Sequence, residues 1–285
     1  MQRHVYYNGS VIQAGAVGLS PFNRGLHYGD GVFETMRVYA GMIFRFEAHM
    51  KRIREGLAVL KIDPDLDTMK MKEAVRQVLH ANELHDASVK ILAFRQGGEG
   101  PTPSDTKASV LITARPFNRE IKASYEKGIS GYVVSIRRNN YSPVSSIKSL
   151  NYLDNILGRL EARDNHAVEA LFLNVDGMVA EGATSNIFIV KNGSLYTPPH
   201  HAGILNGITR QVLLEIIHDL GLKCFQKDFL PDEIYDADEA FLTNSVMEVM
   251  PLVSVNGRAI GAGISGKITE QLMHEYSKLI ERESV

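Results

Sequence analysis

Three residue pairs in the second half of the chain constrain its fold most strongly. Asp176-Gly177, Asn192-Gly193 and Asn256-Gly257 each stand between two strand-like runs. A type I′ turn needs positive φ at both central positions, so each pair predicts a β-hairpin with antiparallel strands. Strands and helices do not alternate regularly along the rest of the chain. A doubly wound parallel sheet is therefore not expected.

Apolar residues at helical spacing predict the helices. Met50, Ile53, Leu57 and Leu60 predict an amphipathic helix over 47–61. A second helix is expected to begin near Asp67 or Thr68 as its N-cap. Further helices are expected near 151–165, 208–220 and 265–282. In the first of these three, the residues expected to point inward are Leu153, Ile156, Leu157 and Leu160.

Runs of β-branched and aromatic residues predict the strands. These runs cover residues 3–13, 32–46, 88–95, 107–115 and 129–138. The pattern predicts a mixed α+β protein, and 285 residues suffice for two domains. We expect a smaller N-terminal domain over 1–116, a connection over 117–125 and a larger C-terminal domain over 126–285. The polar loop at 97–106 is rich in Gly and Pro, so it is expected to be mobile or ordered by a partner.

Charge and composition exclude several classes of function. The formal net charge is -2 and no basic stripe gathers on one predicted face, so a nucleic-acid partner is not expected. Cys224 is the single cysteine, which rules out an intramolecular disulfide and a cysteine-rich metal site. No metal site is predicted. Neither a signal core nor a membrane-length apolar stretch is found, and a cytoplasmic protein is expected.

Three features could carry chemistry, and each also has a purely structural interpretation. Lys148 lies among short polar residues before a helix. Partial desolvation there would lower the pKa of its amine and make it a nucleophile. The structural alternative is a solvated surface lysine, as most lysines are. Glu181 precedes an apolar strand and is followed by small residues, which suits a buried acceptor for a heterocyclic N–H; it could equally end a strand at the surface. The segment Gly207-Ile208-Thr209 opens a helix whose N–H groups suit a phosphate, or serves only as a cap.

In this order the features resemble the class IV aminotransferases, which are fold-type IV pyridoxal-phosphate (PLP) enzymes. The most specific stretch reads E-G-A-T-S-N-I-F from Glu181, then L-Y-T-P-P, then L-N-G-I-T-R ending at Arg210. The resemblance covers almost the whole chain. It implies a two-domain fold like that of D-amino acid aminotransferase, and a homodimer in which the partner contributes a loop to each active site; residues 97–106 are a candidate part of that loop.

The resemblance also implies the roles of individual residues. Lys148 would form the Schiff base and move the proton between the substrate Cα and the cofactor C4′, and Glu181 would pair with the pyridine nitrogen. Arg52 would bind the phosphate, together with the backbone of Gly207, Ile208 and Thr209 and the hydroxyls of Thr209 and Ser245. Tyr152 would donate to the phenolic oxygen, although this tyrosine stands one residue farther from the lysine in the branched-chain enzymes.

Three activities of the family differ only in the substrate pocket. The segment from Leu26 to Tyr39 is similar to the branched-chain enzymes, while Gly29-Asp30-Gly31 is similar to the D-amino acid transaminases and the aminodeoxychorismate lyases. The loop at 95–100 lacks the Arg-x-His of the D-specific enzymes and the second arginine of the lyases. Transamination between a branched-chain L-amino acid and a 2-oxo acid is therefore favoured, with the other two activities as alternatives.

The pocket residues follow from the same resemblance. Tyr28 and Phe33 would form its apolar wall, and Val246 would also contact the substrate. Arg37 and Arg95 are candidates for a carboxylate contact, directly or through neighbours, although Arg95 could instead pair with an acid at a strand end. The non-enzymatic alternative is a PLP-binding family member without activity. It would be signalled by loss of Lys148 or Glu181, and both are present.

Overall fold

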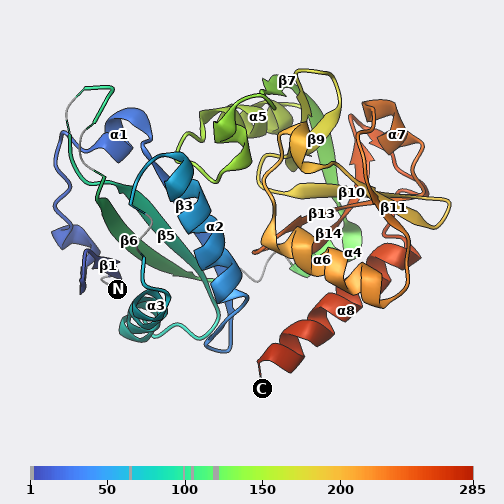
Figure 1. The fold of residues 1–285 in the computed structure, drawn as a ribbon. Coiled ribbons are helices and arrows are strands. Elements are labelled where there is room, and N and C mark those ends of the chain that lie inside the picture. Colours follow the sequence, from blue (N-terminus) through green and yellow to red (C-terminus); the bar gives the residue numbers. More distant parts are fainter. Residues whose placement is uncertain (1–2, 64–65, 99, 104–105, 118–121, 285) are drawn as a thin grey trace. The chain divides into compact units, whose positions relative to one another are not determined.

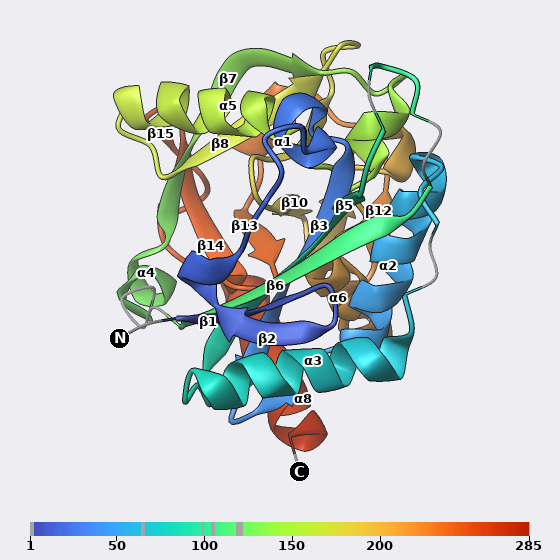
Figure 2. The ribbon, with the colours of Figure 1, turned by 90° about the vertical axis from the view of Figure 1, so that its left-hand side faces the viewer.

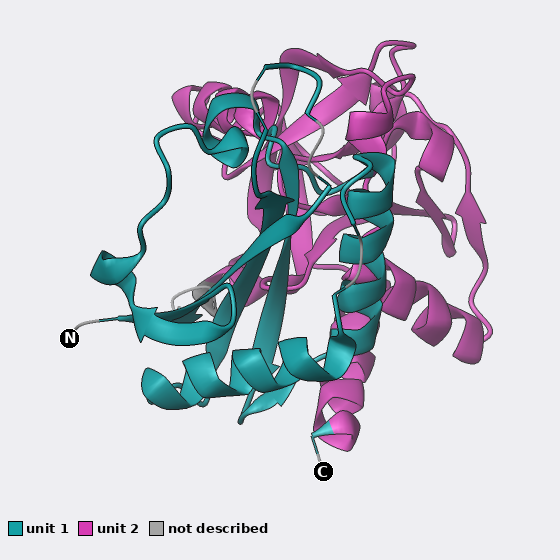
Figure 3. Ribbon diagram, turned by 60° about the vertical axis from the view of Figure 1, so that its left-hand side comes forward, with its two compact units in different colours: residues 1–117, 147–151, 284 teal, residues 118–146, 152–283, 285 magenta. Residues whose placement is uncertain are grey.

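The computed structural model describes residues 3–63, 66–98, 100–103, 106–117 and 122–284. Contacts divide the chain into two compact units, coloured separately in Figure 3. The first comprises residues 1–117 with the short segment 147–151 and residue 284, and the second comprises 118–146, 152–283 and residue 285. The predicted connection at 117–125 lies partly outside the described residues. Among the described helices, none has the length and apolar character needed to cross a bilayer.

The first unit is built on an antiparallel sheet. Its strands, in spatial order, are β2 (Ser10–Gln13), β1 (His4–Tyr7), β6 (Ala108–Pro116), β5 (Ala87–Arg95), β3 (Gly31–Tyr39) and β4 (Met42–Ile43). Its helices are α1 (Arg24–Tyr28), α2 (Phe46–Val59), α3 (Thr68–Ala81) and the 3₁₀ turn Ala14–Ala16. Helix α2 packs against β3, and α3 packs against β1 and β6 (Figures 1 and 2). One face of the sheet is thereby covered by the two long helices.

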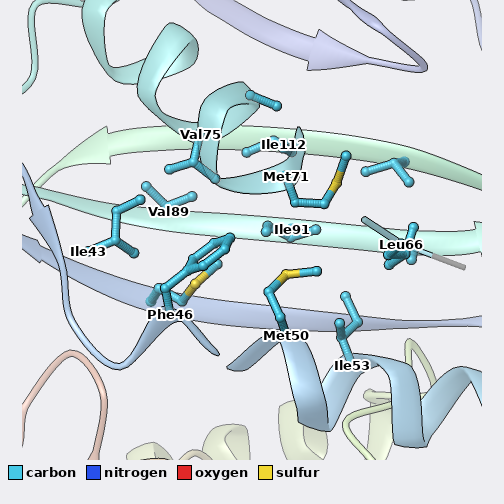
Figure 4. Packing of buried hydrophobic residues seen from close by; sticks show 14 of the residues in the cluster. Ile43, Phe46, Met50, Ile53, Leu66, Met71, Val75, Val89, Ile91 and Ile112 are labelled. Carbon is cyan, nitrogen blue, oxygen red and sulfur yellow. The ribbon is translucent and has the colours of Figure 1, made fainter. Parts of the chain in front are cut away.

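The core of this unit lies between the sheet and those two helices. Figure 4 shows Met50 and Ile53 of α2 and Met71 of α3 directed towards Ile91 of β5. All four are buried, and truncating a buried Ile or Met to Ala typically costs about 2–5 kcal/mol. The predicted helices are confirmed. Asp67 is the N-cap of α3, with its carboxylate accepting from the Lys70 backbone N at 2.8 Å.

Two of the predicted strands are wrong because each is a hairpin. Residues 3–13 fold back at Asn8-Gly9, and residues 32–46 fold back at Ala40-Gly41, before Phe46 begins α2. All four turn residues have positive φ, between 43° and 105°. Asn8-Gly9 is the strongest short hairpin signal in that part of the sequence, whereas Ala40 tolerates its φ of 45° only because the flanking strands pair. The strands predicted at 88–95 and 107–115 are confirmed.

The second unit has a mixed sheet. Its spatial order is β12 (Cys224–Gln226), β11 (Ser194–Thr197), β10 (Asn186–Lys191), β13 (Glu239–Asn244), β14 (Glu248–Val255), β7 (Ile129–Arg138), β8 (Glu169–Asn174) and β9 (Val179–Gly182), with β15 (Arg258–Ala259) paired to β14. The pairs β11–β12, β14–β7 and β7–β8 are parallel. The helices are α4 (Lys122–Lys127), α5 (Leu153–Asp164), α6 (Ile208–Asp219), α7 (Pro231–Tyr235) and α8 (Lys267–Glu283), with 3₁₀ turns at Pro143–Ser146 and His200–Ala202.

All three predicted hairpins form, and two have the predicted turn geometry. Both residues have positive φ at Asn192-Gly193 and at Asn256-Gly257. At Asp176-Gly177 only Gly177 does, with φ 81°. There the Asn174 backbone N donates to the Met178 carbonyl at 2.8 Å, so three residues form the loop instead of two. A type I′ turn is therefore the wrong prediction for this hairpin.

The predicted orientation of α5 is also wrong. The four residues expected to point inward are exposed: Leu153 by 71%, Ile156 by 47%, Leu157 by 51% and Leu160 by 39%. The buried face consists of Asn155, Gly158 and Ala162. A Cβ on Gly158 would lie 2.4 Å from the Phe172 ring of β8. The sheet therefore accepts only the small residues of this helix, and its apolar residues face outward.

Candidate active site

Lys148 lies in a segment that extends the sheet of the first unit. The Phe33 backbone N donates to the Lys148 carbonyl at 2.9 Å, and the Leu150 backbone N donates to the Gly31 carbonyl at 2.9 Å. These bonds hold the segment beside β3 at both ends. The Lys148 side chain is half-buried, with Nζ 4.7 Å from the centre of the Phe33 ring. Backbone pairing thus fixes the position of this amine.

A second lysine that the sequence analysis missed lies over the same ring. Lys90 Nζ is 4.8 Å from the centre of Phe33. Partial burial lowers the pKa of Lys90, and the positive charge of Arg115 lowers it further. Lys90 and Phe33 are on strands that pair directly, two positions apart in register. If the pairing of β3 with β5 had been known, strand alternation would have predicted that Lys90 and Phe33 lie on the same face of the sheet.

Arg52 is paired with a buried carboxylate. Its Nε and Nη2 donate to the two oxygens of Glu34 at 2.6 and 2.7 Å, and His49 Nδ1 lies 2.7 Å from Oε2. Burial alone would raise the pKa of Glu34, but the charges and hydrogen bonds of Arg52 and His49 outweigh it and hold that pKa well below the usual range. Burial lowers the pKa of His49, and the charge and hydrogen bond of Glu34 oppose that shift. The pair fixes the Arg52 guanidinium in one orientation.

The two arginines proposed for a substrate carboxylate have protein partners. Arg95 donates to Asp30 at 2.9 Å and to the Leu60 carbonyl at 2.7 Å. Arg37 donates to the Ala87 carbonyl at 3.1 Å. Both side chains are buried. Tyr28 is about half exposed at the end of α1, with the Arg24 guanidinium 4.8 Å from the centre of its ring.

Glu181 is the centre of a polar cluster in the second unit. Arg138 Nη2 lies 3.0 Å from Oε1, while Asn186 Nδ2 and the Leu205 backbone N donate to Oε2 at 3.2 and 3.0 Å. The side chain is buried on β9. These donors stabilise a negative charge at this position. The buried interpretation of Glu181 is therefore correct, and Arg138 is the partner that the sequence analysis missed.

The loop after Glu181 is held by two side chains from the start of α5. Tyr152 Oη and Asn155 Nδ2 donate to the Ala183 carbonyl at 3.0 and 2.5 Å. Burial, together with the nearby charge of Glu181, raises the pKa of Tyr152 to about 12, so the hydroxyl keeps its proton. A Cβ at Gly182 would lie 2.1 Å from Ser185 Oγ, which explains why a glycine stands there. The hydroxyl proton of Tyr152 is thus already donated within the protein.

The start of α6 presents backbone N–H groups beside this cluster. Gly207 is the N-cap, and no side chain caps the helix. A Cβ on Gly207 would lie 2.0 Å from Asn186 Oδ1, so the helix start approaches the strand that follows Glu181. Thr209 is buried in the first turn. Backbone N–H groups at a helix start and the positive end of the helix dipole are suited to hold an anion.

Ser245 and Val246 lie in the tight turn between β13 and β14. Asn244 Oδ1 accepts from the backbone N of Val246 at 2.9 Å and of Met247 at 2.8 Å. A contact of Val246 with a substrate would therefore have to use atoms other than its N–H. The histidine pair His200-His201 forms no metal site, since no cluster of three or more metal-ligating residues occurs in the described part of the chain.

The residues present fit a phosphorylated pyridine aldehyde. The second unit offers a buried carboxylate for a ring N–H and a helix N-terminus for a phosphate, and the first offers a positioned amine. These are the three groups that PLP requires of its protein: an anionic partner for the ring nitrogen, a phosphate site and a lysine.

Solved structures give the class of the fold. The chain superimposes on the branched-chain amino acid aminotransferase of Escherichia coli with a TM-score of 0.92 and 29% identity, covering 98% of this chain and 94% of that one. It superimposes on the branched-chain amino acid aminotransferase of Thermobaculum terrenum, solved in its PLP form, with a TM-score of 0.90 and 27% identity, over 99% and 95% of the two chains. The predicted α+β, fold-type IV architecture is confirmed.

The sequence comparisons give the family. Residues 31–255 match the family described as amino-transferase class IV, and the chain belongs to this family. It is 34% identical to a putative branched-chain-amino-acid aminotransferase of Methanocaldococcus jannaschii, over 96% of both chains. It is 33% identical to the aminodeoxychorismate lyase of Bacillus subtilis, over 97% of this chain and 94% of the relative. It is 30% identical to the D-alanine aminotransferase of Bacillus licheniformis, over 94% of each. The predicted family and its PLP-dependent transferase class are confirmed.

Proposed function

We propose that this chain is a PLP-dependent aminotransferase that binds its cofactor covalently through Lys148. The observation that carries the proposal is the buried Glu181 carboxylate, which is held by Arg138 and two further N–H donors. These donors favour the charged form of a buried carboxylate beside a loop of small residues, where it could also accept from a protonated ring nitrogen. The protonated pyridine nitrogen of PLP is such a donor.

The roles of the residues follow from their chemistry. When bound, the cofactor would supply an electron-accepting ring for the electron pair of the Cα–H bond. Lys148 would hold the cofactor through Nζ, and once the substrate amine takes its place the freed Nζ would move the proton between the substrate Cα and C4′. Glu181 would keep the ring nitrogen protonated. Tyr152 would hold the loop after Glu181 and, by the family resemblance, approach the phenolic oxygen.

The phosphate would bind at the start of α6. Gly207 is the N-cap of this helix and no side chain caps it, so the backbone N–H groups of Ile208 and Thr209 would donate to the phosphate. The hydroxyls of Thr209 and Ser245 would donate to the phosphate, with the charge of Arg52 as counter-ion. The bidentate pair with Glu34 would hold the guanidinium in place for this role.

We propose branched-chain L-amino acids and their 2-oxo acids as substrates. Phe33 and Tyr28 would contribute the apolar wall. Arg37 and Arg95 would act through their neighbours, because their donors already have protein partners. Lys90 would add a positive charge for a carboxylate, since its Nζ and that of Lys148 lie over the same ring. Val246 would contact the substrate from the turn after β13.

The functional form is proposed to be a homodimer. The exposed apolar face of α5 supports this, because Leu153, Ile156, Leu157 and Leu160 lie at helical spacing on one side. Contiguous exposed apolar residues of this kind mark protein interfaces. Part of the loop at 97–106, which the sequence assigns to the partner's active site, lies outside the described residues.

A half-reaction screen tests the substrate. The protein is loaded with PLP and mixed with single amino acids, while the visible absorption band of the bound cofactor is followed. Loss of the band with L-Leu, L-Ile or L-Val, and formation of pyridoxamine phosphate, is the expected result. Reaction with D-Ala alone would move the chain to the D-specific group. Release of pyruvate and 4-aminobenzoate from aminodeoxychorismate, without pyridoxamine phosphate, would show a lyase.

A substitution at Glu181 tests whether its buried carboxylate supports the proposed function. Glu181→Gln retains the shape but removes the negative charge beside Arg138. PLP should still bind, while turnover should fall by orders of magnitude because the ring nitrogen is no longer held protonated. Unchanged turnover would mean that another acid performs this role.

A further inference from the structure

Asn244 connects two segments that the proposed function assigns to the same cofactor, and the inference rests on that function. Its Oδ1 accepts from the backbone N–H groups of Val246 and Met247 at 2.9 and 2.8 Å. Its Nδ2 donates to the carbonyl of Thr184 at 3.0 Å. One side chain thus closes the turn that contains Ser245 and also reaches the loop that follows Glu181.

Thr184 is held from its other side as well. Its Oγ1 donates to Glu169 Oε2 at 2.8 Å, and Ser185 Oγ lies 3.3 Å from the same oxygen. Glu169 is buried on β8, and its Oε1 accepts from the Ala170 backbone N at 3.1 Å. The result is a continuous chain of hydrogen bonds from β8 through Thr184 to the Ser245–Met247 turn. This network is buried at Glu169 and Ser185 and partly buried at Thr184 and Asn244, and side-chain networks with satisfied members favour one geometry.

The pattern of donors and acceptors selects asparagine at this position. Two N–H groups face Oδ1 and a carbonyl oxygen faces Nδ2, which also fixes the orientation of the amide. An aspartate would keep the turn but would place a carboxylate oxygen against the Thr184 carbonyl. Alanine would lose the turn and the connection together. The function of Asn244 in the turn can therefore be separated from its function in the connection.

We propose that Asn244 is a positioning residue that holds the loop after Glu181 and the Ser245–Met247 turn in one fixed arrangement. The loop places the carboxylate that binds the ring nitrogen, and the turn places the Ser245 hydroxyl assigned to the phosphate and Val246 assigned to the substrate. Breaking the connection lets the two ends of the cofactor site move independently, so it lowers both the order of the loop and the efficiency of the reaction.

Hydrogen–deuterium exchange on the cofactor-free protein tests the connection directly. The Gly182 and Ala183 amides report the loop, because they donate to the carbonyls of Ser185 at 2.7 Å and Ala170 at 2.9 Å. In Asn244→Asp these amides should exchange about tenfold faster, which is the effect of losing one hydrogen bond, while Val246 and Met247 stay protected. In Asn244→Ala both segments should exchange faster.

A matched control and a second variant keep the test decisive. Asn256, just after the other end of β14, also joins two segments through its side-chain amide, accepting from the Val133 backbone N at 2.8 Å and donating to Tyr235 Oη at 2.9 Å. Asn256→Asp should leave the Gly182 and Ala183 amides as protected as in the wild type. Thr184→Val removes the bond to Glu169 but keeps the carbonyl at 184, and it should accelerate exchange in the loop alone.

The kinetic result follows from the same connection. In the PLP-loaded enzyme, Asn244→Asp should lower kcat/KM about tenfold, whereas Asn256→Asp should not change it. Wild-type protection of the loop in Asn244→Asp would overturn the proposal. Failure of the wild type to bind PLP would instead overturn the proposed function, and the exchange data on the cofactor-free chain would still decide whether the connection exists.

Discussion

Replacing Glu34 by glutamine should destabilise the protein more than most single substitutions. Glu34 is 1% exposed and accepts from Arg52 twice, at 2.6 and 2.7 Å, with His49 Nδ1 at 2.7 Å. The Arg52 guanidinium is only 13% exposed, and the substitution removes the negative charge that it pairs with. Breaking a buried ion pair from one side costs about 3–5 kcal/mol. Glutamine keeps one acceptor oxygen, so we expect a loss of about 3 kcal/mol, at the lower end of that range.

A surface ion pair between α2 and α3 provides the control. Glu47 lies 3.0 Å from Lys72 Nζ, but its side chain is 69% exposed. Ion pairs in that setting contribute about 0–1 kcal/mol. Glu47→Gln should therefore change the free energy of unfolding by less than about 1 kcal/mol.

Urea unfolding followed by far-UV circular dichroism measures both variants, because the chain contains no tryptophan for fluorescence. With an m-value of about 3 kcal/mol/M, Glu34→Gln should lower the urea midpoint by about 1 M. If Glu34→Gln and Glu47→Gln unfold at the same urea concentration, the buried pair does not stabilise the first unit as argued.

The stability difference between wild type and Glu34→Gln should depend on pH. Arg52 and His49 hold the folded-state pKa of Glu34 below the ordinary 4.5, despite the opposing effect of burial. A depressed pKa contributes stability that is present above the unfolded pKa and is lost as the pH falls. The difference between wild type and Glu34→Gln should therefore be largest at neutral pH and shrink below about pH 4.5. A difference that grows on acidification would contradict this assignment.

Three further substitutions have expected outcomes. Leu157→Glu on the exposed face of α5 should leave the unfolding midpoint nearly unchanged and convert a dimer to a monomer in light scattering; persistence of the dimer would remove α5 from the interface. Glu239→Ala removes the carboxylate that accepts from the Thr269 backbone N at 2.8 Å at the start of α8, and calorimetry should show a loss of about 1 kcal/mol, as for an N-cap. Gly182→Ala places a Cβ 2.1 Å from Ser185 Oγ, so it should reduce PLP affinity measured by absorbance; unaltered binding would show that the loop yields easily.

Local sequence patterns predicted most of the secondary structure. The α3 helix begins where its Asp67 cap indicates, and the Asn-Gly pairs at 192 and 256 form the expected turns. These features depend on residues close together in the chain. The predicted orientation of α5 was wrong. The helical spacing of its apolar residues identifies an apolar face, but it does not show whether the sheet or another surface covers that face. Its small residues, and Gly158 above all, fit the sheet more closely than its leucines do.

Sequence motifs predicted candidate residues of the site, but not the contacts between them. Sequence context makes Lys148 and Glu181 candidates for the site, but it does not predict their partners. Arg138 lies 43 positions before Glu181, and Asn244 lies 60 positions after Thr184, so only the pairing of strands brings them together. Arg52 was identified as a cation, whereas its ion pair with Glu34 depends on the packing of α2 against β3.

Borohydride reduction followed by peptide mass spectrometry tests the central assignment most directly. The PLP-loaded protein is reduced, digested and searched for the mass of the reduced cofactor on lysine. We predict that the cofactor is found on Lys148, and that Lys148→Ala abolishes the labelled peptide while the protein stays folded by circular dichroism. Labelling of Lys90 in the wild type, or undiminished trapping in Lys148→Ala, would contradict the assignment of Lys148 as the cofactor-binding residue.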